Sequence, residues 1–152
     1  MPRILCLDYG EKRTGVAVSD ETRTIAQSLT TITHRNDEDL MVKIRHLIQK
    51  YNIDLIVIGL PLSLAGKPST RSEKIRRLAS RLARHLHLPV ELFDERLTTR
   101  YAEQIYAEVH GRQFRNQSGP DSPIDRIAAT LILENYLNWV QSCRRRPDVE
   151  NL

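Results

Sequence analysis

Three acidic residues stand at positions that suit a hydrolytic metal site. Asp8 closes the first apolar run of the chain, Glu95 comes shortly after another apolar run, and Asp125 lies in the first turn of the last predicted helix. In open α/β sheets, ligands gather at the carboxyl ends of strands, so the three acids could converge on one site. Three carboxylates repel one another unless a cation lies between them, and Mg²⁺ or Mn²⁺ prefers such oxygen ligands.

Each acid also has an ordinary structural interpretation. Asp8 could begin the turn at Gly10, and Glu95 could pair with a neighbouring arginine on the surface. Asp125 could complete an S-x-x-D capping box with Ser122. The spacing alone leaves the metal site and these structural roles open.

Positive charge gathers in one segment. The chain has 23 Lys and Arg against 19 Asp and Glu, a net charge of +4, and its basic excess lies mainly in residues 71–87. This segment predicts a polyanion as partner, with Arg77, Arg81 and Arg84 in contact with phosphates, and a solvated helix face is the alternative. Lys12 and Arg13, close to Asp8, could steady a phosphate or form an exposed pair of charges in a hairpin.

The elements that must position these residues follow an α/β order. A meander of three strands is followed by a helix that Asn36 caps, because apolar residues then recur on one helical face as far as Tyr51. Residues 55–58 are apolar without alternation, which is typical of a strand covered on both faces. The expected strands are 4–7, 15–19, 24–33, 55–58 and 90–93, and the expected helices are 36–51, 70–87, 99–109 and 123–139.

The length of 152 residues corresponds to one domain, which we expect over 1–140, followed by a basic, flexible tail over 141–152. No apolar run approaches the roughly 20 residues of a membrane helix, and Asp8 comes too early for a secretory signal. Cys6 and Cys143 lie at opposite ends and suggest neither a disulfide framework nor a zinc site. The sequence therefore predicts a cytoplasmic protein that does not contact membranes.

Four motifs occur in a fixed order along the chain. They are DYGEKRTGVAVSD at 8–20, GLPLSLAGKPS at 59–69, DERLTT at 94–99 and PIDRIAATLILENYL at 123–137. Together they resemble the signature blocks of the YqgF family, Holliday junction resolvase-like proteins described as pre-16S rRNA nucleases. The resemblance implies an RNase H-like fold, a mixed five-stranded sheet in which a three-stranded antiparallel meander and two parallel strands are flanked by helices.

The same resemblance implies a metal-dependent nuclease. The family's acidic triad falls on Asp8, Glu95 and Asp125, which would hold two Mg²⁺ or Mn²⁺ ions, with Asp8 shared between them, for phosphodiester hydrolysis. Arg96, next to Glu95, joins the expected nucleic-acid contacts. The implied function is the processing of the 5′ end of pre-16S rRNA in ribosome biogenesis. A resolvase of branched DNA and a non-catalytic nucleic-acid-binding module remain alternatives, and the sequence leaves monomer and homodimer open.

Two segments depart from the family's pattern. Residues 63–65 read Ser, Leu and Ala where the family more often has Asn, Met and Asp, and residues 115–123 lack the Lys-rich run that commonly precedes the last acid. We therefore expect the substrate contacts of these two loops to be weaker or to lie elsewhere.

Overall fold

A computed structural model describes residues 2–60, 70–94 and 123–144, with the side chains of 123–125 and 144 left out. The predicted helix over 99–109 and the two departing loops, 63–65 and 115–122, lie outside the described residues.

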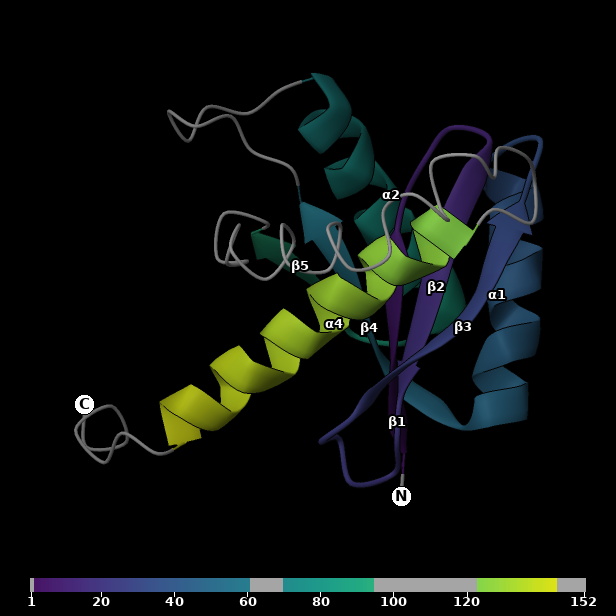
Figure 1. Ribbon diagram of the computed structural model, residues 1–152. Helices are drawn as coiled ribbons and strands as arrows, with labels where there is room; N and C mark the ends of the chain where they lie inside the picture. Colours follow the sequence, from purple (N-terminus) through teal and green to yellow (C-terminus); the bar gives the residue numbers. More distant parts are fainter. Residues whose placement is uncertain (1, 61–69, 95–122, 145–152) are drawn as a thin grey trace.

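Five strands form one mixed sheet in the order β3-β2-β1-β4-β5 (Figure 1). The pairs β1–β2 and β2–β3 are antiparallel, and the pairs β1–β4 and β4–β5 are parallel, as the resemblance implied. The strands are β1 (Arg3–Asp8), β2 (Arg13–Ser19), β3 (Ala26–Thr33), β4 (Ile53–Leu60) and β5 (Val90–Asp94). Because β1, β4 and β5 run in the same direction, their last residues lie at one end of the sheet, called here the carboxyl end.

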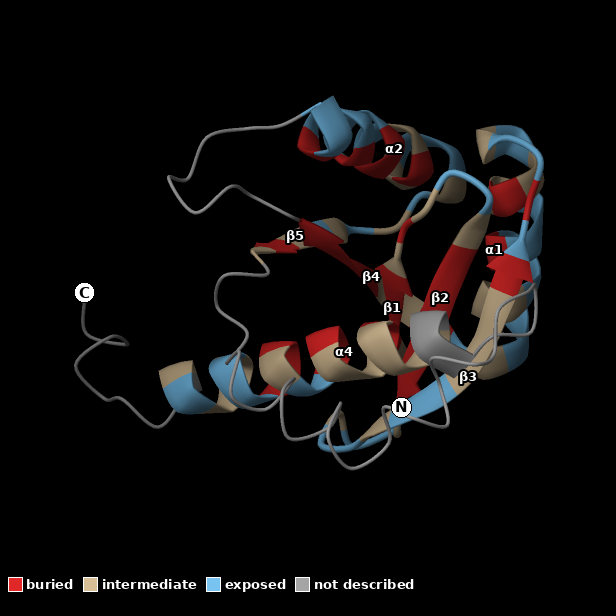
Figure 2. Ribbon diagram, turned by 45° about the horizontal axis from the view of Figure 1, so that its top comes forward, coloured by how far each residue is buried: buried red, intermediate tan, exposed pale blue. Residues whose placement is uncertain are grey.

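Helices cover both faces of this sheet. The helices α1 (Asp37–Tyr51) and α2 (Thr70–Leu86) pack on one face, and α4 (Pro123–Arg144) crosses the other face over β1, β2 and β3 (Figures 1 and 2). The described part of the chain therefore has three layers with the sheet in the middle, and the predicted fold class is confirmed.

The central strands divide their side chains between two cores. In β1, Leu5 and Leu7 pack toward α1 and α2, whereas Ile4 and Cys6 pack toward α4. The apolar run in β4 behaves in the same way, since Val57 joins the α4 side and its neighbours join the opposite side. This double coverage explains why these strands lack an alternation of apolar and polar residues.

The helix ends and faces follow local sequence signals in α1 and α2. The side chain of Asn36 accepts a hydrogen bond from the backbone N–H of Asp39 at 2.8 Å, which confirms the predicted cap of α1. In α2, Ile75, Leu78 and Leu82 are buried, and most of the basic residues are exposed. Both helices are therefore held to the sheet by one apolar face.

The last helix turns a different side inward than the sequence pattern predicted. Ile132 and Tyr136 are buried as expected, but Trp139 is 46% exposed, and Leu133 and Leu137 are buried instead. Apolar residues surround more than one side of α4, so the sequence pattern alone does not fix which side faces the sheet. The helix includes residues 141–144, the first four of the predicted tail. No described helix is long and apolar enough to cross a membrane.

One irregularity interrupts the pairing of β2 with β3, which lies at an edge of the sheet. Val16 pairs with Thr30 and Ala17 pairs with Ser28, so Leu29 is an extra residue on the outer strand. A bulge of this kind bends the strand and increases its twist.

The buried face of α1 gives a direct test of the fold. Ile44 is fully buried against the sheet, whereas Val42, on the same helix, is 53% exposed. Replacing Ile44 with Ala should lower the free energy of unfolding by about 2 to 5 kcal/mol, because it leaves a cavity. Val42→Ala should change this free energy by less than about 0.5 kcal/mol. Urea unfolding of the two variants measures the difference, and equal losses would contradict the packing of α1 described here.

Candidate active site

Asp8 ends β1 at the carboxyl end of the sheet. It pairs with Gly15 of β2, and Leu7 before it pairs with Ile58 of β4, so strands flank it on both sides. Residues two apart on a strand share a face, and Ile4 and Cys6 face α4. Asp8 therefore points to the α4 face of the sheet, where it is half-buried.

The backbone of α4 starts at the same end of the sheet (Figure 1). The helix begins at Pro123, directly after Ser122, as the sequence predicted, and Asp125 is its third residue. Figure 1 shows that α4 starts at the end of the sheet where β1 ends. The side chain of Asp125 lies outside the described residues.

The other predicted acid follows β5. This strand ends at Asp94, so Glu95 and Arg96 lie just outside the part of the chain that the structure describes. Within residues 2–60, 70–94 and 126–143, no three His, Cys, Asp or Glu side chains gather closely enough to hold a metal ion. The predicted metal site, with two of its three acids outside this set, stays a prediction.

Contacts on the α1 side of the sheet hold the turn between β1 and β2. The Tyr9 ring is buried and stacked on His34, with 6.1 Å between the ring centroids, and its hydroxyl donates to Asp37 of α1 at 2.9 Å. Burial, followed by the hydrogen bond to Asp37, raises the pKa of Tyr9 to about 12. Within the turn, a Cβ on Gly10 would lie 2.4 Å from the carbonyl oxygen of Arg13, so this close approach requires glycine.

His34 supports the same turn from the end of β3. Its backbone N–H donates to the carbonyl oxygen of Lys12 at 3.0 Å, and its Nε2 lies 2.9 Å from the Thr14 hydroxyl. The His34 side chain is buried, and burial lowers its pKa below the ordinary value of 6.5. The turn that follows Asp8 is therefore fixed by β3 as well as by α1.

The predicted basic residues fall into different environments. Arg13 lies in β2 on the same face as Asp8, since it shares the parity of Ala17, and Lys12 is exposed in the turn. Arg77 and Arg84 are exposed on α2. Arg81 instead bridges to α1, where its guanidinium donates to Asp37 at 3.4 Å and to Glu38 at 2.5 Å. Arg81 therefore links the two helices in this structure.

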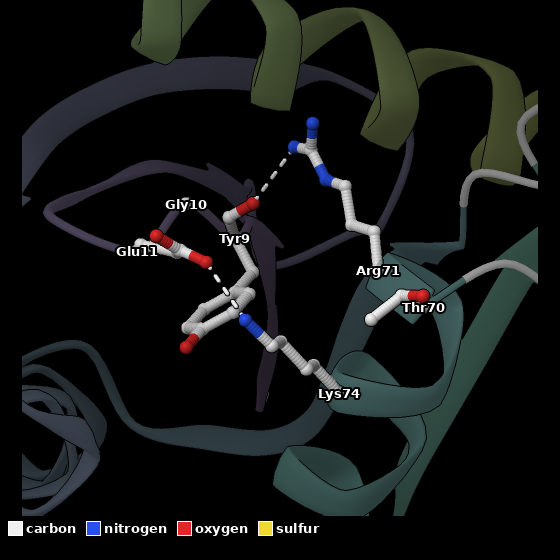
Figure 3. A pocket seen from close by; sticks show the side chains of 6 residues that line it. All are labelled: Tyr9, Gly10, Glu11, Thr70, Arg71 and Lys74. Carbon is white, nitrogen blue, oxygen red and sulfur yellow. Dashed lines mark hydrogen bonds and ion pairs between the residues drawn. The ribbon is translucent and has the colours of Figure 1, made fainter.

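A pocket of about 350 Å³ opens between the β1–β2 turn and the start of α2 (Figure 3). Arg71 donates to the carbonyl oxygen of Tyr9 at 3.0 Å, and the Lys74 ammonium donates to Glu11 at 2.8 Å. The hydrogen bond from Lys74 and the positive charge of Lys74 lower the pKa of Glu11 below its ordinary value. The lining residues are Tyr9, Gly10, Glu11, Thr70, Arg71 and Lys74.

Sequence reasoning did not single out Arg71 and Lys74 among the cations of α2. A signal for them existed in the chain order. Nine residues separate the end of β4 from the start of α2, so the first turn of α2 is near the carboxyl end of the sheet and its last turn is farther away.

Comparison with known proteins identifies the family. Residues 2–139 match the family model described as "RuvX: Holliday junction resolvase". The chain belongs to the RuvX family. A relative from Syntrophus aciditrophicus, described as "Putative pre-16S rRNA nuclease", is 44% identical over 91% of this chain and 89% of its own length. A relative of the same description from Chloroflexus aurantiacus is 39% identical over 89% of this chain and 86% of its own.

The fold of this RuvX protein also resembles a solved resolvase. RuvC from T. thermophilus, solved in complex with a Holliday junction substrate, aligns with a TM-score of 0.59 over 92% of this chain and 97% of its own, at 11% identity. That identity supports the fold alone. The RuvX match confirms the family resemblance drawn from the four motifs, together with the interpretation of the chain as a nuclease.

The buried His34 makes the stability of the turn depend on pH. Its folded-state pKa is lower than its unfolded value of 6.5, so the unfolded chain binds more protons as the pH falls below about 6.5. The free energy of unfolding should therefore decrease from pH 7.5 to pH 5.5, a window above the ordinary pKa of carboxylates. Urea unfolding should show a shallower pH dependence in His34→Gln, while His46→Gln, at an exposed site on α1, should keep the wild-type dependence. Equal slopes in all three proteins would contradict this assignment.

Proposed function

We propose that this protein is a divalent-metal-dependent endonuclease that acts on the precursor of 16S rRNA. The proposal rests mainly on the placement of Asp8, which ends the central strand on the face that α4 covers. The first turn of α4, with Asp125, begins at the same end of the sheet. The strand end that carries Asp8 and the helix start that carries Asp125 therefore lie at one end of the sheet (Figure 1).

The third predicted acid, Glu95, directly follows the end of β5 in the chain. Phe93 of β5 packs on the face of the sheet that α4 covers, which is also the face of Asp8. The strands β1 and β5 are separated by β4, about 10 Å apart at roughly 4.8 Å per strand spacing. We include Glu95 in the proposed site on this chain order and on the family's acidic triad.

The donors of this site fit a hard divalent cation, since all three are carboxylates. Asp8, Glu95 and Asp125 would hold Mg²⁺ or Mn²⁺, which when bound would stabilise developing charge on the phosphate and make water a better nucleophile. Arg13, on the face of Asp8, and Lys12, in the adjacent turn, would hold the phosphate of the bond to be cleaved. Arg96 would join them from the β5 side.

The substrate is the finer part of the proposal. The names of the relatives support pre-16S rRNA, and the family description supports a Holliday junction as the second candidate. The same acids would serve either substrate, because the chemistry takes place at a phosphodiester in both. A panel of precursor rRNA, single-stranded RNA and four-way DNA junction separates the two by cleavage rate.

Neutralising Asp8 should abolish the proposed activity. Asp8→Asn should lower cleavage of the preferred substrate at least about 100-fold, because an amide cannot replace a carboxylate that holds cations. A chelator should stop the wild-type enzyme, and Mg²⁺ or Mn²⁺ should restore it. Asp54→Asn is the control, since Asp54 lies at the opposite end of the sheet in an ion pair with Arg23.

Two outcomes of this experiment would overturn the nuclease proposal. One is cleavage by purified Asp8→Asn at the wild-type rate. The other is a wild-type activity that the chelator leaves unchanged. Melting curves with and without metal add a second readout, because Asp8→Asn and Asp125→Asn should each lose the stabilisation that the metal gives the wild-type protein.

The exposed cations of α2 should contact the nucleic-acid backbone. Replacing Arg77 and Arg84 with Gln should reduce the slope of log K against log salt by about 1.4, at about 0.7 per lost contact with a single strand. The affinity should fall by a similar factor for every sequence tested. Replacing Arg3 and Lys50, which lie outside α2, is the charge-matched control. If both double variants have the wild-type slope, these arginines form only a solvated face.

A further inference from the structure

The pocket beside the β1–β2 turn brings two cations to the residues that directly follow Asp8. Arg71 and Lys74 approach from α2, while Tyr9 and Glu11 approach from the turn (Figure 3). Tyr9 packs on the face of the sheet that α1 and α2 cover, opposite to the face of Asp8. A nucleic-acid strand bound at Asp8 would therefore reach this pocket by passing over the carboxyl end of the sheet.

The Glu11 carboxylate, which lines this pocket, is held loosely. Glu11 is 75% exposed and Lys74 is 51% exposed, so the ion pair between them is surrounded by water. Exposed pairs of this kind contribute little to stability, because water screens the charges and both side chains lose rotational freedom. A second anion with more acceptor oxygens could displace Glu11 at little cost.

Arg71 adds a fixed donor to the same pocket. Its contact with the Tyr9 carbonyl oxygen uses one of the five N–H groups of a guanidinium and orients the planar group beside the turn. Arginine forks match the geometry of phosphate oxygens, and an ammonium adds a point charge. The pocket volume of about 350 Å³ lies at the small end of ligand sites, which span roughly 300 to 1,000 Å³.

The pocket also continues into a line of positive charge. Arg77 and Arg84 follow Lys74 by three and ten residues on α2, and both are exposed. At about 1.5 Å of rise per residue, they lie roughly 4.5 and 15 Å farther along the helix axis. A strand that enters the pocket can therefore follow α2 without leaving the positive surface.

We propose that this pocket is a phosphate-binding subsite for a backbone phosphate outside the cleaved bond, in which Arg71 and Lys74 are the ligands. The Glu11 carboxylate occupies the place of the phosphate in the free protein and is displaced when the strand binds. This inference rests on the proposed nuclease function, because the nucleic-acid strand that would occupy the subsite is the substrate of that function. Because Glu11 and the phosphate compete for Lys74, Glu11 lowers the affinity of the pocket for any nucleic acid that binds Lys74 weakly.

The test measures binding of a labelled single-stranded RNA in the presence of chelator, so that no cleavage occurs. Glu11→Gln should bind about two to five times more tightly than the wild type, the factor that corresponds to removing an exposed ion pair and one negative charge. Lys74→Gln should bind more weakly and lower the salt slope by about 0.7. Arg71→Gln should also bind more weakly, and Arg71→Lys should recover part of the loss.

Matched controls separate a local effect from net charge. Glu21→Gln removes an exposed acid that pairs with Arg3 at the opposite end of the sheet, and Lys50→Gln removes a cation from the last turn of α1. If Glu11→Gln gains no more affinity than Glu21→Gln, the displacement by phosphate is wrong. If Lys74→Gln matches Lys50→Gln in affinity and salt slope, the subsite is wrong.

A cleavage assay on the same proteins distinguishes this inference from the proposed function. Failure of the subsite would leave metal-dependent cleavage by the wild type intact and still sensitive to Asp8→Asn. Failure of the nuclease function would appear as cleavage that is absent, or independent of Asp8, in the wild type itself. In the Glu11→Gln/Lys74→Gln double variant, the gain from Glu11→Gln should be smaller than in the single variant, because its partner is missing.

Discussion

The parallel pairing of β1 with β4 is the constraint on which the rest of the structure depends. Leu5 and Leu7 of β1 fill one core, and Ile4 and Cys6 fill the other, so a slip of one residue would exchange the two sets. The fixed register also decides where the chain's chemistry lies. Asp8 is on the α4 face because Cys6 is, and Tyr9 is on the opposite face for the same reason.

Tyr9 connects the end of β1 to the helices on one face of the sheet. Its hydroxyl binds Asp37 of α1, its ring lies on His34, and its carbonyl oxygen accepts from Arg71 of α2. Asp37 also forms an ion pair with Arg81 of α2. The residue after the proposed catalytic acid is thus attached to α1, α2 and the end of β3, which keeps Asp8 in one position before substrate arrives.

Local signals made much of this architecture predictable. Asn36 was expected to cap α1, and uninterrupted apolar runs indicated the buried central strands. The position of Asp8 at a strand end followed from the same pattern. The partners of the α2 cations could not be predicted. Which of Lys74, Arg77 and Arg81 meets an acid depends on how α2 is rotated about its axis against its neighbours, and the sequence pattern does not fix that rotation. Trp139 was assigned to the buried side for a related reason, since the phase of α4 is set by the sheet on which it packs.

The extra residue in β3 has a consequence for contacts between molecules. An edge strand presents unpaired backbone N–H and C=O groups, to which a strand of another molecule can add. In β3, Leu29 interrupts the regular spacing of these groups between Ser28 and Thr30. A straight strand from a second molecule could pair along only part of this edge before losing register. The bulge therefore disfavours the addition of a further strand at the β3 edge of the sheet.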